Sequence, residues 1–184
     1  MVINNDKKAL VYELNKIMKF INKFFKSKSN ALTKQAENLV SAANIFAVSS
    51  FVTTLDRFPI LLKVDPKQWD FIVSVAGIFI AESRFNGLQL DSVEESLLMD
   101  VVTKKLSEWD SDGIRAFEDC KSLFETEYDR LASSPEYQKN SRFLSSDALG
   151  VWIFWNLFGR QAQSDEEINL VRVLGSLVTY AFFD

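Results

Sequence analysis

The chain has 184 residues, of which 47% are hydrophobic and 25% are charged, a balance typical of a folded globular domain. It contains no histidine, which excludes serine–histidine–aspartate and cysteine–histidine catalysis and every metal site that needs an imidazole ligand. The single cysteine, Cys120, cannot form an internal disulfide, so we expect a cytoplasmic protein and not a disulfide-stapled secreted module.

The net charge of −4 is unevenly distributed along the chain. Residues 1–34 hold eight lysines against two acidic residues, whereas residues 91–129 hold twelve acidic against four basic residues. We expect the basic and acidic stretches either to face each other in the fold or to attract different partners.

Helical periodicity dominates the first half of the chain. A first helix is predicted over residues 6–26, with lysines on the arc opposite its apolar row. A second helix over 31–55 has little charge, which favours a central position in a bundle. A connection over 56–66 then leads to a third helix from Pro66 to about Asn86. The apolar row of the first helix consists of Leu10, Leu14, Ile17, Ile21 and Phe24.

The second half continues in the same way. A fourth helix is expected from Ser92 and a fifth from Asp112, and Ser133–Pro135 interrupts the pattern before a short helix or turn over 136–142. A sixth helix is predicted over 146–158, ending at Gly159, and a last helix from Ser164 to near the end of the chain. Capping boxes are predicted for the fourth and last helices, formed by Ser92 with Glu95 and by Ser164 with Glu167.

These patterns predict an all-α fold, a single-domain bundle of about seven helices that spans residues 1–184. No alternating strand pattern is bounded by turn residues. The longest uncharged run, residues 38–55, includes seven polar residues, so we do not expect a membrane span.

Motifs for catalysis and cofactor binding are absent from the sequence. The six glycines are too far apart for a dinucleotide-binding or phosphate-binding loop. Residues 108–119 partly match a calcium-binding EF-hand loop, but the pattern fits a helix–turn–helix connection capped by Asp112 better. Cys120 lies on an apolar row and is interpreted as a buried thiol, and Trp152 and Trp155 as core residues or the wall of an apolar ligand pocket. We therefore expect no enzyme, no cofactor and no metal ion.

The acidic stretch carries the functional hypothesis. Acidic residues on the polar side of the fourth and fifth helices are expected to lie in water and to attract a protein with a basic surface. The sequence thus predicts a non-catalytic protein-binding module, comparable in composition to immunity proteins or adaptors. The predicted partner-binding residues are Glu94, Glu95, Asp100, Glu108, Glu118, Glu125 and Asp129.

The basic first helix gives an alternative. Its lysine face, opposite Leu, Ile and Phe, is also typical of a peripheral helix that lies on an anionic membrane or binds lipid. Nucleic-acid binding is not expected, because these lysines have no arginine or exposed aromatic residues among them. The lysines that would contact the membrane are Lys16, Lys19, Lys23 and Lys26.

Overall fold

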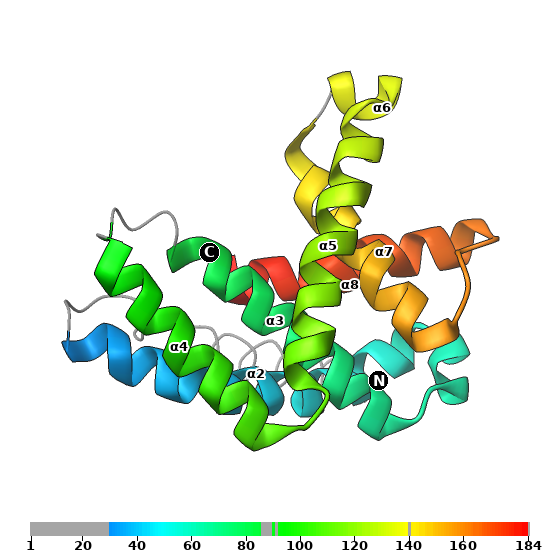
Figure 1. Cartoon of the computed structure of the whole chain (residues 1–184). Coiled ribbons are helices and arrows are strands. Elements are labelled where there is room, and N and C mark those ends of the chain that lie inside the picture. The colour runs from blue at the N-terminus through cyan, green and yellow to red at the C-terminus, as the bar shows by residue number, and fades with distance from the viewer. Residues whose placement is uncertain (1–29, 86–89, 91, 140, 184) are drawn as a thin grey trace, which may run out of the picture.

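The computed structural model describes residues 30–85, 90, 92–139 and 141–183. Over these residues it contains seven α-helices, two short 3₁₀ helices and no strand, which confirms the predicted all-α bundle (Figure 1). The helix predicted over 6–26, with the four lysines that would contact a membrane in the alternative hypothesis, lies outside the described residues.

The helices follow the predicted order closely. Helix α2 begins at Asn30 instead of residue 31, and α7 begins at Leu144 instead of residue 146. The predicted connection over 56–66 contains a 3₁₀ helix, η1. Gly159 ends α7 with φ of 64°, a left-handed conformation that glycine adopts without strain. The elements are α2 (Asn30–Arg57), η1 (Pro59–Lys63), α3 (Pro66–Phe85), α4 (Ser92–Trp109), α5 (Gly113–Ala132), α6 (Pro135–Lys139), η2 (Ser141–Phe143), α7 (Leu144–Phe158) and α8 (Asp165–Phe183).

Helix α3, and not α2, occupies the centre of the bundle. Every residue from Ile72 to Glu82 is buried, because α3 packs against α2, α5, α7 and α8. Trp69, near the start of α3, is fully buried and donates its indole N–H to the carbonyl oxygen of Ala47 at 2.9 Å. The prediction of a central second helix is therefore wrong. The low charge of α2 reflects an apolar outer face as well as a buried inner one.

The outer face of α2 carries Ile45, Val48 and Val52, which are 60%, 52% and 63% exposed. By length and composition, Thr33–Arg57 would be able to cross a membrane, although the core helices of soluble proteins meet the same criterion. In the structure α2 packs against α3 and α4, and 39% of its most apolar stretch is buried. One side of α2 thus belongs to the core, whereas apolar groups remain exposed on the other.

Helices α7 and α8 approach each other unusually closely at two glycines. A Cβ atom on Gly150 would lie 2.0 Å from the carbonyl oxygen of Val171, and one on Gly175 would lie 1.6 Å from that of Ser146. Only residues without a Cβ atom allow the two backbones to come this near. The crossing fixes the position of α7 relative to α8, and these two helices supply much of both concave regions described below.

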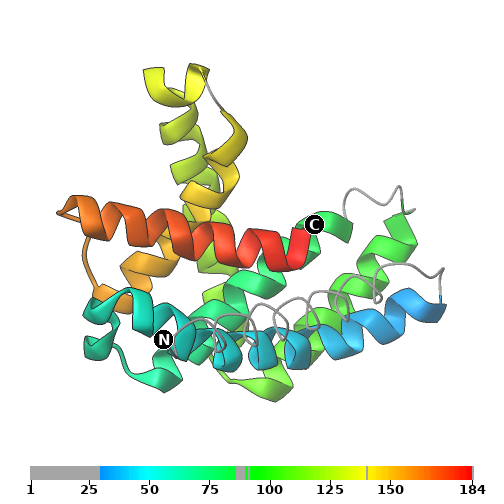
Figure 2. The ribbon, with the colours of Figure 1, turned by 180° about the vertical axis from the view of Figure 1, so that it is seen from behind.

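The second half of α5 projects from the bundle together with α6 and η2. Figures 1 and 2 show this projection from opposite sides, in yellow-green and yellow, standing away from the layer that contains α2 and α4. At the base of this projection, α5 and η2 contact α7, the helix that precedes α8 in the sequence. A groove and a cavity are lined by residues of α5, α7 and α8.

Candidate functional site

The acidic residues predicted to bind a partner are all exposed, but they do not form one surface. Helices α4 and α5 diverge from their shared turn, so their far ends lie at separate extremities of the molecule (Figures 1 and 2). Glu94 and Glu95 lie in the first turn of α4, whereas Glu125 and Asp129 lie in the projecting half of α5. The structure therefore divides the predicted set into an α4 group and an α5 group.

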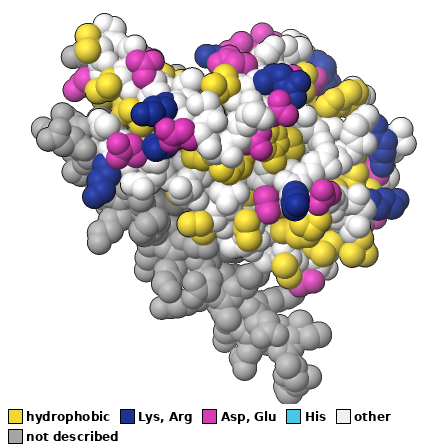
Figure 3. Space-filling model, turned by 60° about the horizontal axis from the view of Figure 1, so that its bottom comes forward, with side chains coloured by type: hydrophobic (Ala, Val, Ile, Leu, Met, Phe, Trp, Pro, Cys, Tyr) yellow, Lys and Arg dark blue, Asp and Glu magenta, His cyan; other side chains and the backbone are white. Residues whose placement is uncertain are grey.

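Acidic side chains near the end of α4 are partly neutralised by neighbouring lysines. Glu108 accepts a hydrogen bond from Lys105 at 2.7 Å and lies 3.9 Å from the ammonium group of Lys104. The hydrogen bond from Lys105 lowers the pKa of Glu108. Figure 3 shows acidic and basic side chains interspersed among hydrophobic ones over the face that it presents. Within the α4 group, Glu108 is thus a weaker attractor of cations than its sequence indicates.

Two residues of the α5 group, by contrast, border a groove of about 840 Å³, whereas Glu118 does not line it. Glu125 and Asp129 line it from α5, and Ser176, Thr179 and Tyr180 line it from α8. The groove also reaches Ile80 and Ser83 of α3 and the junction of η2 with α7. We call this region the acidic groove. It brings together four segments that are distant in sequence.

Aromatic side chains accompany these carboxylates. Tyr128, Phe143 and Tyr180 line the acidic groove and are 37%, 49% and 59% exposed. Tyr128 packs against Phe124, with tilted rings whose centroids lie 5.9 Å apart, but its outer part reaches solvent. The Thr179 hydroxyl is buried without a hydrogen-bond partner in the described part of the chain. Exposed aromatic rings beside carboxylates favour binding of cationic and aromatic groups.

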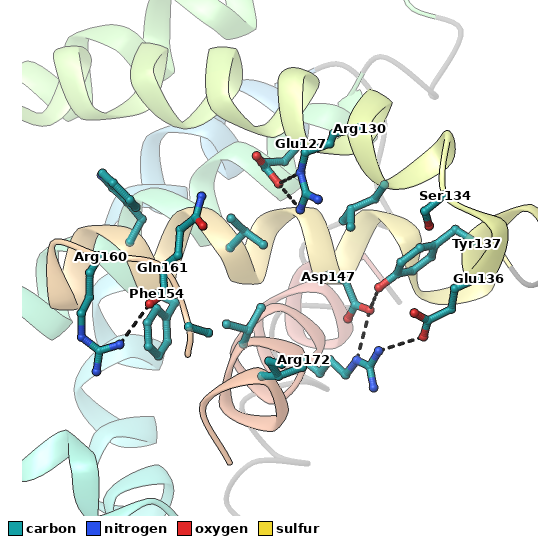
Figure 4. A pocket seen from close by; sticks show the side chains of 16 residues that line it. Glu127, Arg130, Ser134, Glu136, Tyr137, Asp147, Phe154, Arg160, Gln161 and Arg172 are labelled. Atoms are coloured by element: carbon teal, nitrogen blue, oxygen red, sulfur yellow. Dashed lines mark hydrogen bonds and ion pairs between the residues drawn. The ribbon is translucent and has the colours of Figure 1, made fainter. Parts of the chain in front are cut away.

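A second concave region, a cavity of about 480 Å³, lies between α5, α6, α7 and α8 (Figure 4). At one end Tyr137 donates a hydrogen bond to Oδ2 of Asp147, and Nε of Arg172 lies 3.6 Å from the same oxygen. Asp147 is only 5% exposed, and its Oδ1 atom has no hydrogen-bond partner among the described residues. Burial raises the pKa of Asp147, and burial together with the bond to Asp147 raises the pKa of Tyr137 to about 12.

Arg160 occupies the other end of this cavity. Its guanidinium group makes a two-pronged ion pair with Glu167, at 2.5 and 2.9 Å, and lies 5.8 Å from the centroid of the Phe154 ring. The Glu167 carboxylate also accepts the backbone N–H of Gln163 at 2.7 Å. The Arg160 contact, followed by the Gln163 bond, lowers the pKa of Glu167 to about 2. The loop between α7 and α8 is thereby fixed to the first turn of α8.

Sequence reasoning interpreted Trp152 and Trp155 as core residues or the wall of an apolar pocket, and it missed the polar cluster of Tyr137, Asp147 and Arg172. One signal was present, because Asp147 is the only charged residue between Leu144 and Phe158. A single carboxylate in such an apolar helix needs either water or specific partners. Of the two tryptophans, Trp152 is fully buried and donates to Asp119 at 2.9 Å, whereas Trp155 is 45% exposed and lines the cavity.

The turn between α4 and α5 does not gather the side chains of a calcium loop. Asp119 accepts the Trp152 indole N–H, and Asp110 accepts the backbone N–H of Asp112 at 2.8 Å. Within the described residues no group of three acidic or cysteine side chains is arranged to hold a metal ion. Asp112 precedes α5 as predicted, but its side chain pairs with Arg115 at 3.1 Å instead of capping the helix.

Cys120 is fully buried, in agreement with its interpretation as a core thiol. Burial, followed by the nearby charge of Asp119, raises the pKa of Cys120 well above its ordinary value. A thiol in this state is a poor nucleophile, because the thiolate is the reactive form.

Comparison of the chain with protein-family models, with curated proteins and with solved structures finds no match.

Proposed function

We propose that this protein is a non-catalytic protein-binding module that recognises a basic partner through the acidic groove. The observation that carries the proposal is the position of Glu125 and Asp129 in the same groove as three exposed aromatic residues. Carboxylates speed the encounter with a basic surface, and exposed aromatic rings supply anchoring area once the partner is bound. The partner segment would offer lysine or arginine together with an apolar or aromatic side chain.

Two features support this region over the α4 group. The groove is concave, so a bound side chain would lose more contact with water there than on an open helix face. Helix α4 carries local ion pairs at Glu108 that a partner would have to displace.

The test compares two charge reversals of equal size. Glu125 and Asp129 are replaced together by lysine in one variant, and Glu94 and Glu95 in the other. The probe is a labelled peptide of alternating lysine and tryptophan, and its binding is followed by fluorescence anisotropy. The groove variant should bind about tenfold more weakly or worse, whereas the α4 variant should change by less than about threefold, since distant exposed charges act weakly.

Peptides of alternating lysine and glycine, and of alternating glutamate and tryptophan, are the comparison probes. Both should bind more weakly than the lysine–tryptophan peptide, because each offers only one of the two chemistries of the groove. Equal losses in the two charge-reversal variants, with circular dichroism showing both folded, would refute the groove as the binding site.

The alternative of a peripheral membrane or lipid-binding protein is favoured by one observation, the exposed apolar face of α2 with Ile45, Val48 and Val52. Such a face, together with the lysines of the N-terminal stretch, would suit an anionic membrane surface. Ile45→Ser with Val48→Ser should then reduce co-sedimentation with phosphatidylserine-containing vesicles and leave peptide binding unchanged. No loss of co-sedimentation would exclude α2 from membrane contact.

A further inference from the structure

We propose that the acidic groove selects arginine over lysine, and that it holds the partner's guanidinium group against the ring of Tyr128 with its N–H groups directed at the carboxylates of Glu125 and Asp129. The inference rests on the proposed function, because it concerns the same groove and names the residue type that the partner presents there. It goes beyond charge attraction, which alone would treat arginine and lysine alike.

Glu125 and Asp129 supply accessible charged acceptors. Both side chains are exposed, and both line the acidic groove from α5. They are four residues apart, so they lie on one face of the helix, with about 5–6 Å between their Cβ atoms. Neither carboxylate forms an ion pair with another described residue, whereas the neighbouring Glu127 is paired with Arg130. The N–H groups of a bound cation would therefore meet two carboxylates at the spacing of one helical turn.

Tyr128 adds an aromatic ring beside these two carboxylates. It follows Glu125 by three residues, directly precedes Asp129 and lines the same groove. Its ring packs against Phe124 but remains 37% exposed, so a ligand can reach it. A ring next to two anions favours a planar cation, because a guanidinium group stacks through its face and donates hydrogen bonds from its edge. The ammonium group of lysine is a compact, strongly hydrated charge that lacks this geometry.

The rest of the lining is consistent with this cation. Phe143 and Tyr180, which are 49% and 59% exposed, extend the aromatic surface from η2 and α8. No lysine or arginine is among the described residues that line the acidic groove, whereas three arginines line the cavity between α5, α6, α7 and α8. The groove thus combines negative charge with aromatic area and has no described cation of its own to compete with the partner.

The chain holds one of its own arginines by the same two contacts. The Arg160 guanidinium group lies 5.8 Å from the centroid of the Phe154 ring, beside which Figure 4 shows it, and it makes the two-pronged ion pair with Glu167. An aromatic ring and a carboxylate together therefore fix a guanidinium group in this fold. The acidic groove offers the same pair of groups at its surface, where the arginine would come from the partner.

The test compares a peptide of alternating arginine and tryptophan with the lysine–tryptophan peptide of equal length, by fluorescence anisotropy at equal ionic strength. The wild-type protein should bind the arginine peptide about fivefold more tightly, as expected for a partly exposed cation–π contact. Tyr128→Leu should reduce this ratio to less than about twofold, whereas Tyr128→Phe keeps the ring and should retain it. Trp155→Leu is the matched control, because it removes a 45% exposed ring that lines the cavity and not the acidic groove.

Equal affinities of the wild-type protein for the two peptides would overturn the inference, and so would a ratio that persists in Tyr128→Leu. Should that variant unfold, Asp129→Asn decides, because this side chain is exposed and its replacement leaves the core intact. The ratio should fall in Asp129→Asn as well, and an unchanged ratio would contradict the arginine assignment.

Failure of the proposed function gives a different result. In that case the double lysine replacement of Glu125 and Asp129 weakens neither peptide, whatever the ratio of their affinities. If this replacement weakens both peptides but the wild-type protein binds them equally, the acidic groove remains the binding site and only the selection of arginine is refuted.

Discussion

Glu167 binds three residues of the loop before α8, namely Arg160, Gln163 and Ser164. Its carboxylate binds Arg160 and the Gln163 N–H, while its own backbone N–H donates to the Ser164 hydroxyl at 3.3 Å. The contacts of the carboxylate, first with Arg160 and then with Gln163, lower its pKa from 4.5 to about 2, so they stabilise the folded protein while the carboxylate is ionised. The stabilisation should be complete above about pH 5 and should be lost as the pH falls from 4.5 towards 2.

Glu167→Gln should therefore lower stability near neutral pH. The difference in the free energy of unfolding between the variant and the wild-type protein should shrink as the pH falls from about 6 to about 3. Urea unfolding at several pH values measures it. Glu166→Gln is the control, because Glu166 is exposed and precedes Glu167 by one position. A difference that stays constant over this pH range would show that the Arg160 pair does not stabilise the fold.

Glu167 also shows which contacts a local sequence pattern can predict and which it cannot. The spacing of Ser164 and Glu167 predicted a capping box, and the Ser164 half of it is present. The Glu167 carboxylate also interacts with the Ser164 backbone, as the box requires, but its main partners are Arg160 and Gln163. Gly159 turns the chain back after α7, which brings Arg160 within reach of Glu167. Such a contact depends on the path of a loop, and helical periodicity does not predict that path.

At the level of elements, Gly175→Ala should destabilise the protein severely. The new methyl group would meet the Ser146 carbonyl oxygen and the Gly150 nitrogen, which are backbone atoms and cannot rotate away. Separating α7 from α8 would disturb the core, and we expect a cost of more than about 2 kcal/mol. Thermal and urea unfolding measure the loss.

Gly159→Ala is the matched comparison for this variant. Among the described residues no atom lies within 4 Å of the position its Cβ would take, and the positive φ of 64° is what opposes the substitution. It should cost about 1–2 kcal/mol, the usual penalty for a left-handed alanine. A Gly175→Ala variant as stable as Gly159→Ala would show that the two helices can separate without loss.

The positions of the helices in the sequence were predictable, because capping residues, prolines and 3.6-residue periodicity are local signals. Which helices pack against one another was not predictable from these signals. Val93 and Leu97 belong to the apolar row of α4, yet they are 74% and 52% exposed, because the first turns of α4 extend beyond the described core. The exposure of Glu125 and Asp129 followed from their place on α5, whereas the groove beside them required η2 and α8 to meet α5.

At the scale of the whole molecule, the basic stretch over residues 1–34 and the acidic stretch over 91–129 allow two arrangements. The lysines can cover the acidic surface, or each stretch can bind its own partner. If the acidic groove is open to a basic partner, lysines elsewhere in the chain should not compete with the peptide probe. The proposal thus depends on the charge pattern of the full chain as well as on the groove.

If the acidic groove is open, replacing Lys16, Lys19, Lys23 and Lys26 by glutamine should leave the affinity for the lysine–tryptophan peptide within about twofold, since salt screens charges that lie more than a Debye length from a binding site. Binding to vesicles with about 30% phosphatidylserine should fall markedly if these lysines contact a membrane, because each contributes about 1 kcal/mol near an anionic surface. Anisotropy and vesicle co-sedimentation at equal ionic strength give the two values. An increase in peptide affinity of tenfold or more, equal to at least about 1.4 kcal/mol, would show that the lysines cover the acidic groove in the native protein.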